Sequence, residues 1–108
     1  MINANLSQFL DNGWFSEATL FYNGYIYWCE GCWDNTKEKP MHFFVYKIPA
    51  RNIDNLYFER LDTNEPFEYI FETWGKCEDD VKEEFLNAKI FDGKTFWEVE
   101  KELAWLDE

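Results

Sequence analysis

Three cysteines and a single histidine are the residues of this chain whose types could ligate a metal ion or act as nucleophiles. Cys29 and Cys32 form a C-x-x-C pair, and His42 and Cys77 would complete a Cys₃His set, a ligand combination of structural zinc sites. Zinc folds usually bring two close pairs together, whereas His42 and Cys77 each stand alone. We therefore expect one or both of Cys29 and Cys32 to pack as small apolar side chains near a strand end, with a zinc-stabilised domain as an alternative.

Redox chemistry and nucleophilic catalysis have weaker support. A thioredoxin-like C-x-x-C pair lies at the start of a helix in a βαβ unit, whereas Cys29 follows a strand-like run and the acidic Glu30 and Asp34 disfavour a thiolate. His42 could serve as a base, yet the sequence marks no nucleophile, base and oxyanion-binding segment together, and it has no Gly-rich phosphate loop. We expect no catalytic residues, no cofactor and no enzymatic activity.

Carboxylates are the most abundant groups that could carry a function. The chain has 22 acidic and 10 basic residues, and its formal net charge is -12. Such a field repels nucleic acids and anionic membranes and attracts basic partners. We therefore expect neither direct nucleic-acid binding nor membrane association. An acidic surface that serves solubility alone is the simplest alternative.

The acidic excess is concentrated in the last third of the chain. Residues 77–108 hold 11 acidic residues and four lysines, a net charge of -7 against -5 for residues 1–76. Acids four positions apart on a helix lie about 6 Å apart along its axis, so a regular row could imitate a nucleic-acid backbone and occupy a basic groove. Interleaved lysines such as Lys82 would weaken this imitation, because they allow local ion pairs.

Aromatic side chains are the second candidate contact. They make up 21% of the chain, with 11 Phe, six Tyr and six Trp, which is more than a domain of this size is expected to bury. An exposed Trp among carboxylates suits a partner that carries arginines, through stacking and charge pairing. Trp105, with the edge of the core as its alternative position, and Trp33, in a loop, are the two candidates. The candidate partner-binding residues are Asp79, Asp80, Glu83, Glu84, Glu98, Glu102, Trp105 and Trp33.

Several strands are predicted between the positions of these groups. Asn23-Gly24 between β-rich runs is a strong signal for a hairpin with a type I′ turn, and the turn-rich residues after Cys29 indicate an exposed loop. Pro49 would close a further, mostly apolar strand. The predicted segments are strands at 17–22, 25–29, 41–48, 55–61 and 66–74 and a loop at 30–40.

Helices are predicted at both ends of the chain. Residues 5–12 would form a short helix that ends at Asn12-Gly13. Residues 79–88 have an apolar stripe, and Asp79 is a candidate N-cap. Thr95 and Glu98 match a capping box at the start of a final helix, whose stripe would run from Phe96 to Leu106.

Strands followed by helices, without βαβ alternation, predict an α+β fold. We expect an antiparallel meander sheet of four to five strands, with a short N-terminal helix and two C-terminal helices packed on one face. The 108 residues suit a single domain spanning 1–108. The first residues lack a signal-peptide pattern, no run approaches a membrane span, and at least one cysteine must stay unpaired within a monomer. These features favour the cytoplasm.

The sequence therefore predicts a non-enzymatic, acidic interaction protein. It would bind and inhibit a basic or nucleic-acid-binding partner protein, as an inhibitor, an immunity protein or a nucleic-acid mimic. In size, acidity and lack of a catalytic signature the chain is similar in character to small inhibitor and immunity proteins carried by bacteria and their mobile elements, although no specific residues carry this likeness. The alternatives are the zinc-stabilised domain and a small-molecule-binding or enzymatic domain with an aromatic pocket.

Overall fold

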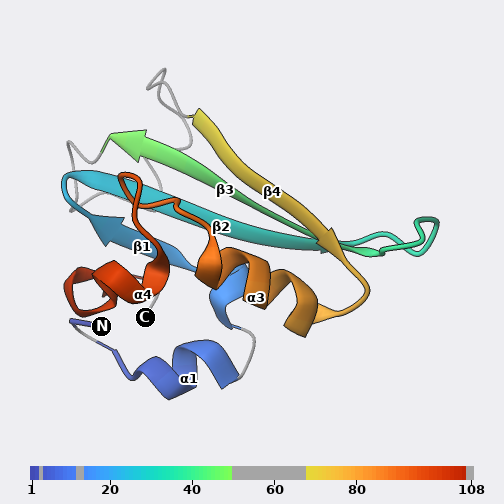
Figure 1. Cartoon of the computed structure of the whole chain (residues 1–108), viewed down its shortest axis with the longest axis horizontal. Helices are drawn as coiled ribbons and strands as arrows, with labels where there is room; N and C mark the ends of the chain where they lie inside the picture. Colours follow the sequence, from blue (N-terminus) through green and yellow to red (C-terminus); the bar gives the residue numbers. More distant parts are fainter. Residues whose placement is uncertain (3, 12–13, 50–67, 107–108) are drawn as a thin grey trace.

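Five antiparallel strands form one sheet in the order β4-β3-β2-β1-β5 (Figure 1). The computed structural model describes residues 1–2, 4–11, 14–49 and 68–106. The strands are β1 (Thr19–Tyr22), β2 (Tyr25–Trp33), β3 (Met41–Pro49), β4 (Glu68–Gly75) and β5 (Ala104–Trp105). The first four strands follow one another as the predicted meander, and β5 returns to pair with β1. The strand predicted at 55–61 lies outside the described residues.

The predicted hairpin turn is confirmed at Asn23-Gly24. Asn23 has a φ of 50° and Gly24 a φ of 84°, and a type I′ turn requires positive φ at both positions. The following strand is longer than predicted, because residues 30–33 continue to pair with β3 as far as Trp33 opposite Met41. The exposed loop is therefore residues 34–40, and Trp33 lies at the end of a strand.

The helices pack on one face of the sheet (Figure 1). They are α1 (Leu6–Asp11), α3 (Glu78–Asn87) and α4 (Phe96–Val99), with short 3₁₀ turns η1 (Trp14–Glu17) and η3 (Glu100–Glu102). Alternate strand residues, among them Tyr27, Cys29 and Phe43, are fully buried against this layer, because side chains alternate between the faces of a strand. Phe85 of α3 packs in the centre of the core, 5.1 Å from Phe43 between ring centroids. Of the described helices, none is long and apolar enough to cross a membrane.

The predicted final helix is wrong beyond its first turns. Phe96, Val99 and Leu103 are buried as the stripe predicted, but the helix gives way to η3, and Leu103 is extended. Ala104 and Trp105 then pair with β1. This pairing satisfies their backbone groups at an open edge of the sheet, and it buries the Trp105 ring against Phe9 with a centroid distance of 5.2 Å.

The start of α3 also differs from its prediction. The N-cap is Cys77, which is extended and makes no side-chain cap bond, so Asp79 lies within the first turn. Asp80 takes over part of the capping role, because its carboxylate accepts the backbone N–H of Lys76 at 3.1 Å. Acidic residues in a first turn also interact favourably with the positive end of the helix dipole.

The predicted capping box is confirmed at the start of α4. The Thr95 hydroxyl accepts the Glu98 N–H at 3.3 Å, and the Glu98 carboxylate accepts the Thr95 N–H at 2.9 Å. We expect Thr95→Ala to lower the free energy of unfolding by about 1 kcal/mol, measured by urea denaturation. Glu98→Gln is the matched control, because an amide oxygen can still accept the Thr95 N–H. If Thr95→Ala and Glu98→Gln lowered the free energy of unfolding equally, the capping bond of the Thr95 hydroxyl would make no specific contribution to stability.

Candidate partner-binding site

The acidic surface of α3 lies opposite its buried face. Val81, Phe85 and Leu86 are buried against the sheet and the neighbouring helices. With 3.6 residues per turn, the residues between them point outward. The exposed carboxylates of this surface are Asp79, Asp80, Glu83 and Glu84, four of the candidate partner-binding residues. The helix therefore presents its acids away from the core.

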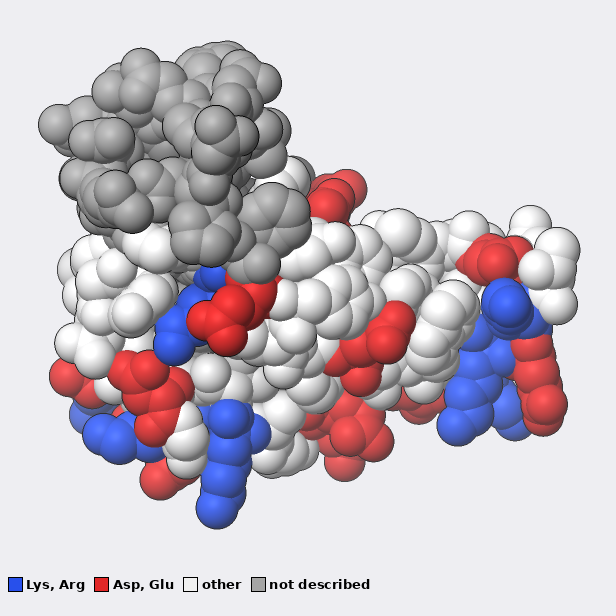
Figure 2. All heavy atoms as spheres, turned by 90° about the horizontal axis from the view of Figure 1, so that it is seen from above, with Lys and Arg blue, Asp and Glu red and all other residues white. Residues whose placement is uncertain are grey.

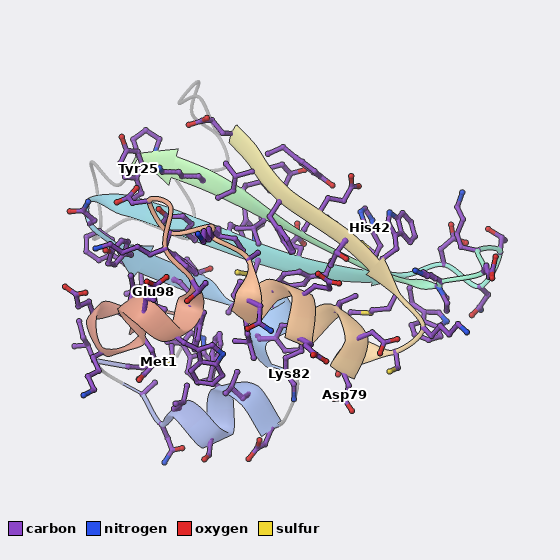
Figure 3. All side chains as sticks on the ribbon, viewed as in Figure 1. Met1, Tyr25, His42, Asp79, Lys82 and Glu98 are labelled. Atoms are coloured by element: carbon purple, nitrogen blue, oxygen red, sulfur yellow. The ribbon has the colours of Figure 1, made fainter. Side chains whose placement is uncertain are left out.

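Lys82, the lysine expected to interrupt these acids, turns toward α1 (Figure 3). Its amine is 3.4 Å from the carbonyl oxygen of Leu10, at the end of α1, where a cation is favourable. The same amine is 3.6 Å from Asp79, whose side chain remains 87% exposed. Among the described residues, the carboxylates of Asp80, Glu83 and Glu84 have no ion pair with Lys82.

A surface groove runs between α3 and the end of β4. Its volume is about 670 Å³. The acidic wall belongs to α3. The other wall is formed by the end of β4, the residue after it and the loop between β2 and β3. The lining residues are Asp80, Glu83, Glu84 and Asn87 on α3, with Trp74, Gly75, Lys76 and Lys39 opposite. Three carboxylates face two lysines, so the groove is acidic on one wall and mixed overall.

Gly75 allows α3 to lie this close to β4. A Cβ atom at this position would stand 2.7 Å from the Asp80 Cβ and 3.0 Å from Val81 Cγ1. The glycine is buried and pairs with Met41 across the strands. A side chain here would push the acidic start of α3 away from the sheet, so the absence of one fixes the width of the groove.

Trp33 lies beside carboxylates on the other side of the start of α3. It is 57% exposed, and its indole N–H donates to the Asn35 side chain. It lines a second groove, of about 440 Å³, together with Glu17 and Glu78. The combination of an exposed indole and carboxylates, expected at Trp105, therefore occurs at Trp33. Sequence reasoning did not select Glu17, because only the pairing of β2 with its neighbours brings η1 near the start of α3.

Trp105 does not provide an exposed ring. It lies in β5 and is only 6% exposed, because it packs in the main core. The interpretation of Trp105 as a surface contact on a helix is wrong. Its alternative was a position at the edge of the core, and the ring is buried on the edge strand β5.

The remaining candidate carboxylates lie apart from α3. Glu98 is held by its capping bonds to Thr95, and Glu102 is exposed in η3. Figure 3 places Glu98 and Asp79 at opposite ends of the helical layer. The two helices therefore do not form the single acidic row that a long nucleic-acid mimic requires.

The C-x-x-C pair is split by the sheet. Residues three positions apart on a strand point to opposite faces, so Cys29 is buried in the core while Cys32 is exposed opposite His42. Cys77 lies at the start of α3. Among the described residues, no group of three or more His, Cys, Asp and Glu side chains could hold a metal ion. The fold does not assemble the Cys₃His set.

His42 belongs to a polar network on the face of the sheet opposite the helices. Its ring stacks on Trp74 with centroids 4.0 Å apart and an interplanar angle of 4°. Its Nε2 atom is 2.6 Å from a Glu72 carboxylate oxygen, which also accepts the Tyr69 hydroxyl at 2.8 Å. The bonds from Tyr69 and His42 lower the pKa of Glu72. Desolvation and the bond to Glu72 raise the pKa of Tyr69 to about 12. The network holds Trp74 in place at the wall of the first groove.

Neither groove has the form of a small-molecule site. Such sites are largely enclosed and mostly apolar, whereas both grooves are open and lined in part by charged side chains. A comparison with protein families, curated proteins and solved structures found no match.

Proposed function

We propose that this protein is a non-enzymatic binding protein that docks on a basic or nucleic-acid-binding partner protein and inhibits it. The observation that carries the proposal is the outer face of α3, where Asp80, Glu83 and Glu84 line one groove while Lys82 is turned to α1. Trp33, exposed in the neighbouring groove, supplies the aromatic anchor. The groove of Trp33 reaches α3 at Glu78, two residues before Asp80 at the near end of the acidic groove, so one partner surface could contact both.

Charge and anchor contribute differently to such an interface. An exposed ion pair contributes only about 0.2–1 kcal/mol and is screened by salt. The carboxylates would therefore mainly accelerate and orient the encounter with a basic partner. A large aromatic side chain in a desolvated centre contributes more to affinity, and Trp is enriched among such residues. Trp33 would accordingly supply much of the specificity.

The geometry supports the blocking of a local basic patch rather than the imitation of a long duplex. The carboxylates of α3 form two short rows. Each row consists of two residues four positions apart, which is about 6 Å along the helix. Glu98 lies at the other end of the helical layer (Figure 3). A surface of this size could cover a few arginines or lysines of a nucleic-acid-binding site, which is sufficient to exclude the nucleic acid.

Capture from a cell lysate tests the proposal. We expect immobilised protein to retain basic proteins in about 0.05 M salt and to release them in about 1 M salt, where the Debye length falls to about 3 Å. Mass spectrometry identifies the released proteins. Retention that is equal at both salt concentrations, or retained proteins without basic surfaces, would remove the electrostatic basis of the proposal.

A further inference from the structure

Strand β4 is an edge strand whose outer side is unpaired in the part of the chain that the structure describes. It has eight residues, Glu68–Gly75, and it is first in the strand order, with β3 as its neighbour. An edge strand presents alternate N–H and C=O groups outward, which is a template for another extended chain. The opposite edge is the two-residue β5, which is too short to serve in this way.

The second half of β4 is the regular part of this edge. The pairing of β4 with β3 is irregular near Val45 and Tyr46, whereas residues 71–75 continue in unbroken register opposite residues 41–45. Bulges protect edges from unwanted pairing, so the irregularity leaves Phe71–Gly75 as the available segment. This segment ends at Trp74 and Gly75, which line the acidic groove of α3.

The charge around this edge favours a basic occupant over a second copy of the chain. Figure 2 looks onto this side of the molecule, where acidic side chains lie along the middle of the described surface and basic ones gather toward its two ends. Lys39 and Lys76 lie near Gly75, in the groove that also holds the acids of α3. Glu72 lies on β4 itself, with its side chain 46% exposed. Two copies that met along β4 would bring these acids together, and like charges at facing strand positions are destabilising.

We propose that an extended, lysine- or arginine-bearing segment of the partner adds to the sheet as a new strand along Phe71–Gly75. The proposal rests on the proposed function and specifies its binding mode. Backbone hydrogen bonds to β4 would supply affinity, and alternate side chains would supply specificity. The partner's side chains on the helix-covered face of the sheet would point toward Asp80, Glu83 and Glu84. Those on the opposite face would lie near Trp74 and Glu72.

A peptide pair tests strand addition separately from charge. The probe is a short synthetic peptide of alternating lysine and threonine, which places all its lysines on one side of an extended strand. The matched peptide carries N-methyl groups on alternate backbone nitrogens, which keep the charge and remove the hydrogen-bond donors of one edge. We expect the N-methylated peptide to bind the full-length protein about tenfold or more weakly, as the loss of two or more hydrogen bonds implies, measured by calorimetry.

Amide hydrogen exchange locates the peptide. We expect alternate backbone amides within residues 71–75 to exchange more slowly when the unmodified peptide is bound. Equal affinities for the two peptides, or no binding of either, would overturn strand addition. Protection of the same amides that rises with protein concentration and needs no peptide would assign the edge to a second copy and would also overturn it.

The variant Asp80→Asn/Glu83→Gln/Glu84→Gln tests the acidic surface of α3 separately from strand addition to β4. It should weaken both peptides and preserve the difference between them, because the edge of β4 is unchanged. If the variant bound both peptides as tightly as the wild type does, the proposed role of the acidic surface in binding would be wrong. A difference in affinity between the two peptides that persisted in the variant would still support strand addition.

Discussion

Replacing Phe85 with alanine is expected to lower the free energy of unfolding by about 3–5 kcal/mol, the usual range for the loss of a buried phenylalanine. Phe85 is fully buried. Its ring lies 5.1 Å from that of Phe43 on the sheet and 5.8 Å from that of Phe96 on α4. It thus fastens α3, with its acidic surface, to the sheet. A loss of this size is a large part of the about 5–15 kcal/mol that a domain usually has.

Two further variants make this expectation specific to the core. Phe85→Leu keeps most of the apolar volume and should cost distinctly less than Phe85→Ala, because less of a cavity is left. Trp97→Ala removes an aromatic ring that is 50% exposed and should cost less than about 1 kcal/mol. All variants can be compared by urea denaturation. A Phe85→Ala variant no less stable than Trp97→Ala would contradict the placement of α3 on the sheet.

Neutralising the groove wall of α3 is expected to weaken binding of the captured partner about 3- to 100-fold at low salt. The variant is Asp80→Asn/Glu83→Gln/Glu84→Gln, and the range corresponds to about 0.6–2.7 kcal/mol, within the sum for three exposed ion pairs at about 0.2–1 kcal/mol each. Most of the loss should appear in the association rate, because exposed charges steer the encounter. Asn at position 80 can still accept the Lys76 N–H that Asp80 accepts, so α3 should retain its first turn.

The matched control removes the same charge elsewhere. Asp11→Asn/Glu98→Gln/Glu102→Gln changes exposed acids on α1, α4 and η3, and the Gln at position 98 can keep the capping bond to Thr95. We expect this variant to bind with nearly wild-type affinity at moderate salt, since the lost charges lie outside the contact. If both variants lost affinity equally, the net charge of the protein, and not the surface of α3, would be responsible.

The sheet could be predicted because its signals are local. The turn at Asn23-Gly24 needs residues that tolerate positive φ, and the strand residues that pack in the core alternate along the sequence. The capping box at Thr95 and Glu98 is likewise set by residues three positions apart. Each of these elements is decided within a few residues, so the fold class follows from the sequence.

The end of the chain could not be predicted, because its conformation depends on a distant partner. Ala104 and Trp105 become a strand only because β1 offers an open edge, and nothing near them in the sequence reveals that edge. Their helical spacing was therefore misleading, although the same spacing correctly identified Val99 and Leu103 as buried. Tertiary pairing overrode local pattern at this position.

The candidate site was only partly visible for the same reason. Helical periodicity identified the outward acids of α3. The inward turn of Lys82 depends on the carbonyl of Leu10, which is far away in the sequence. The grouping of Trp33 with Glu17 and Glu78 depends on how η1, β2 and α3 meet in space. Residue types and spacing therefore predicted the charges, and the fold determined which aromatic ring lies beside them.

The most direct test of the central claim is the dissociation constant of the captured partner, measured at about 0.05 M and 0.5 M salt for the wild-type protein and the Asp80→Asn/Glu83→Gln/Glu84→Gln variant. We expect the affinity of the wild type to fall steeply with salt, because a shorter Debye length screens exposed pairs. We expect the variant to bind more weakly at low salt and to depend much less on salt. Equal affinities of the two proteins at both salt concentrations would contradict the claim that the acidic surface of α3 binds the partner.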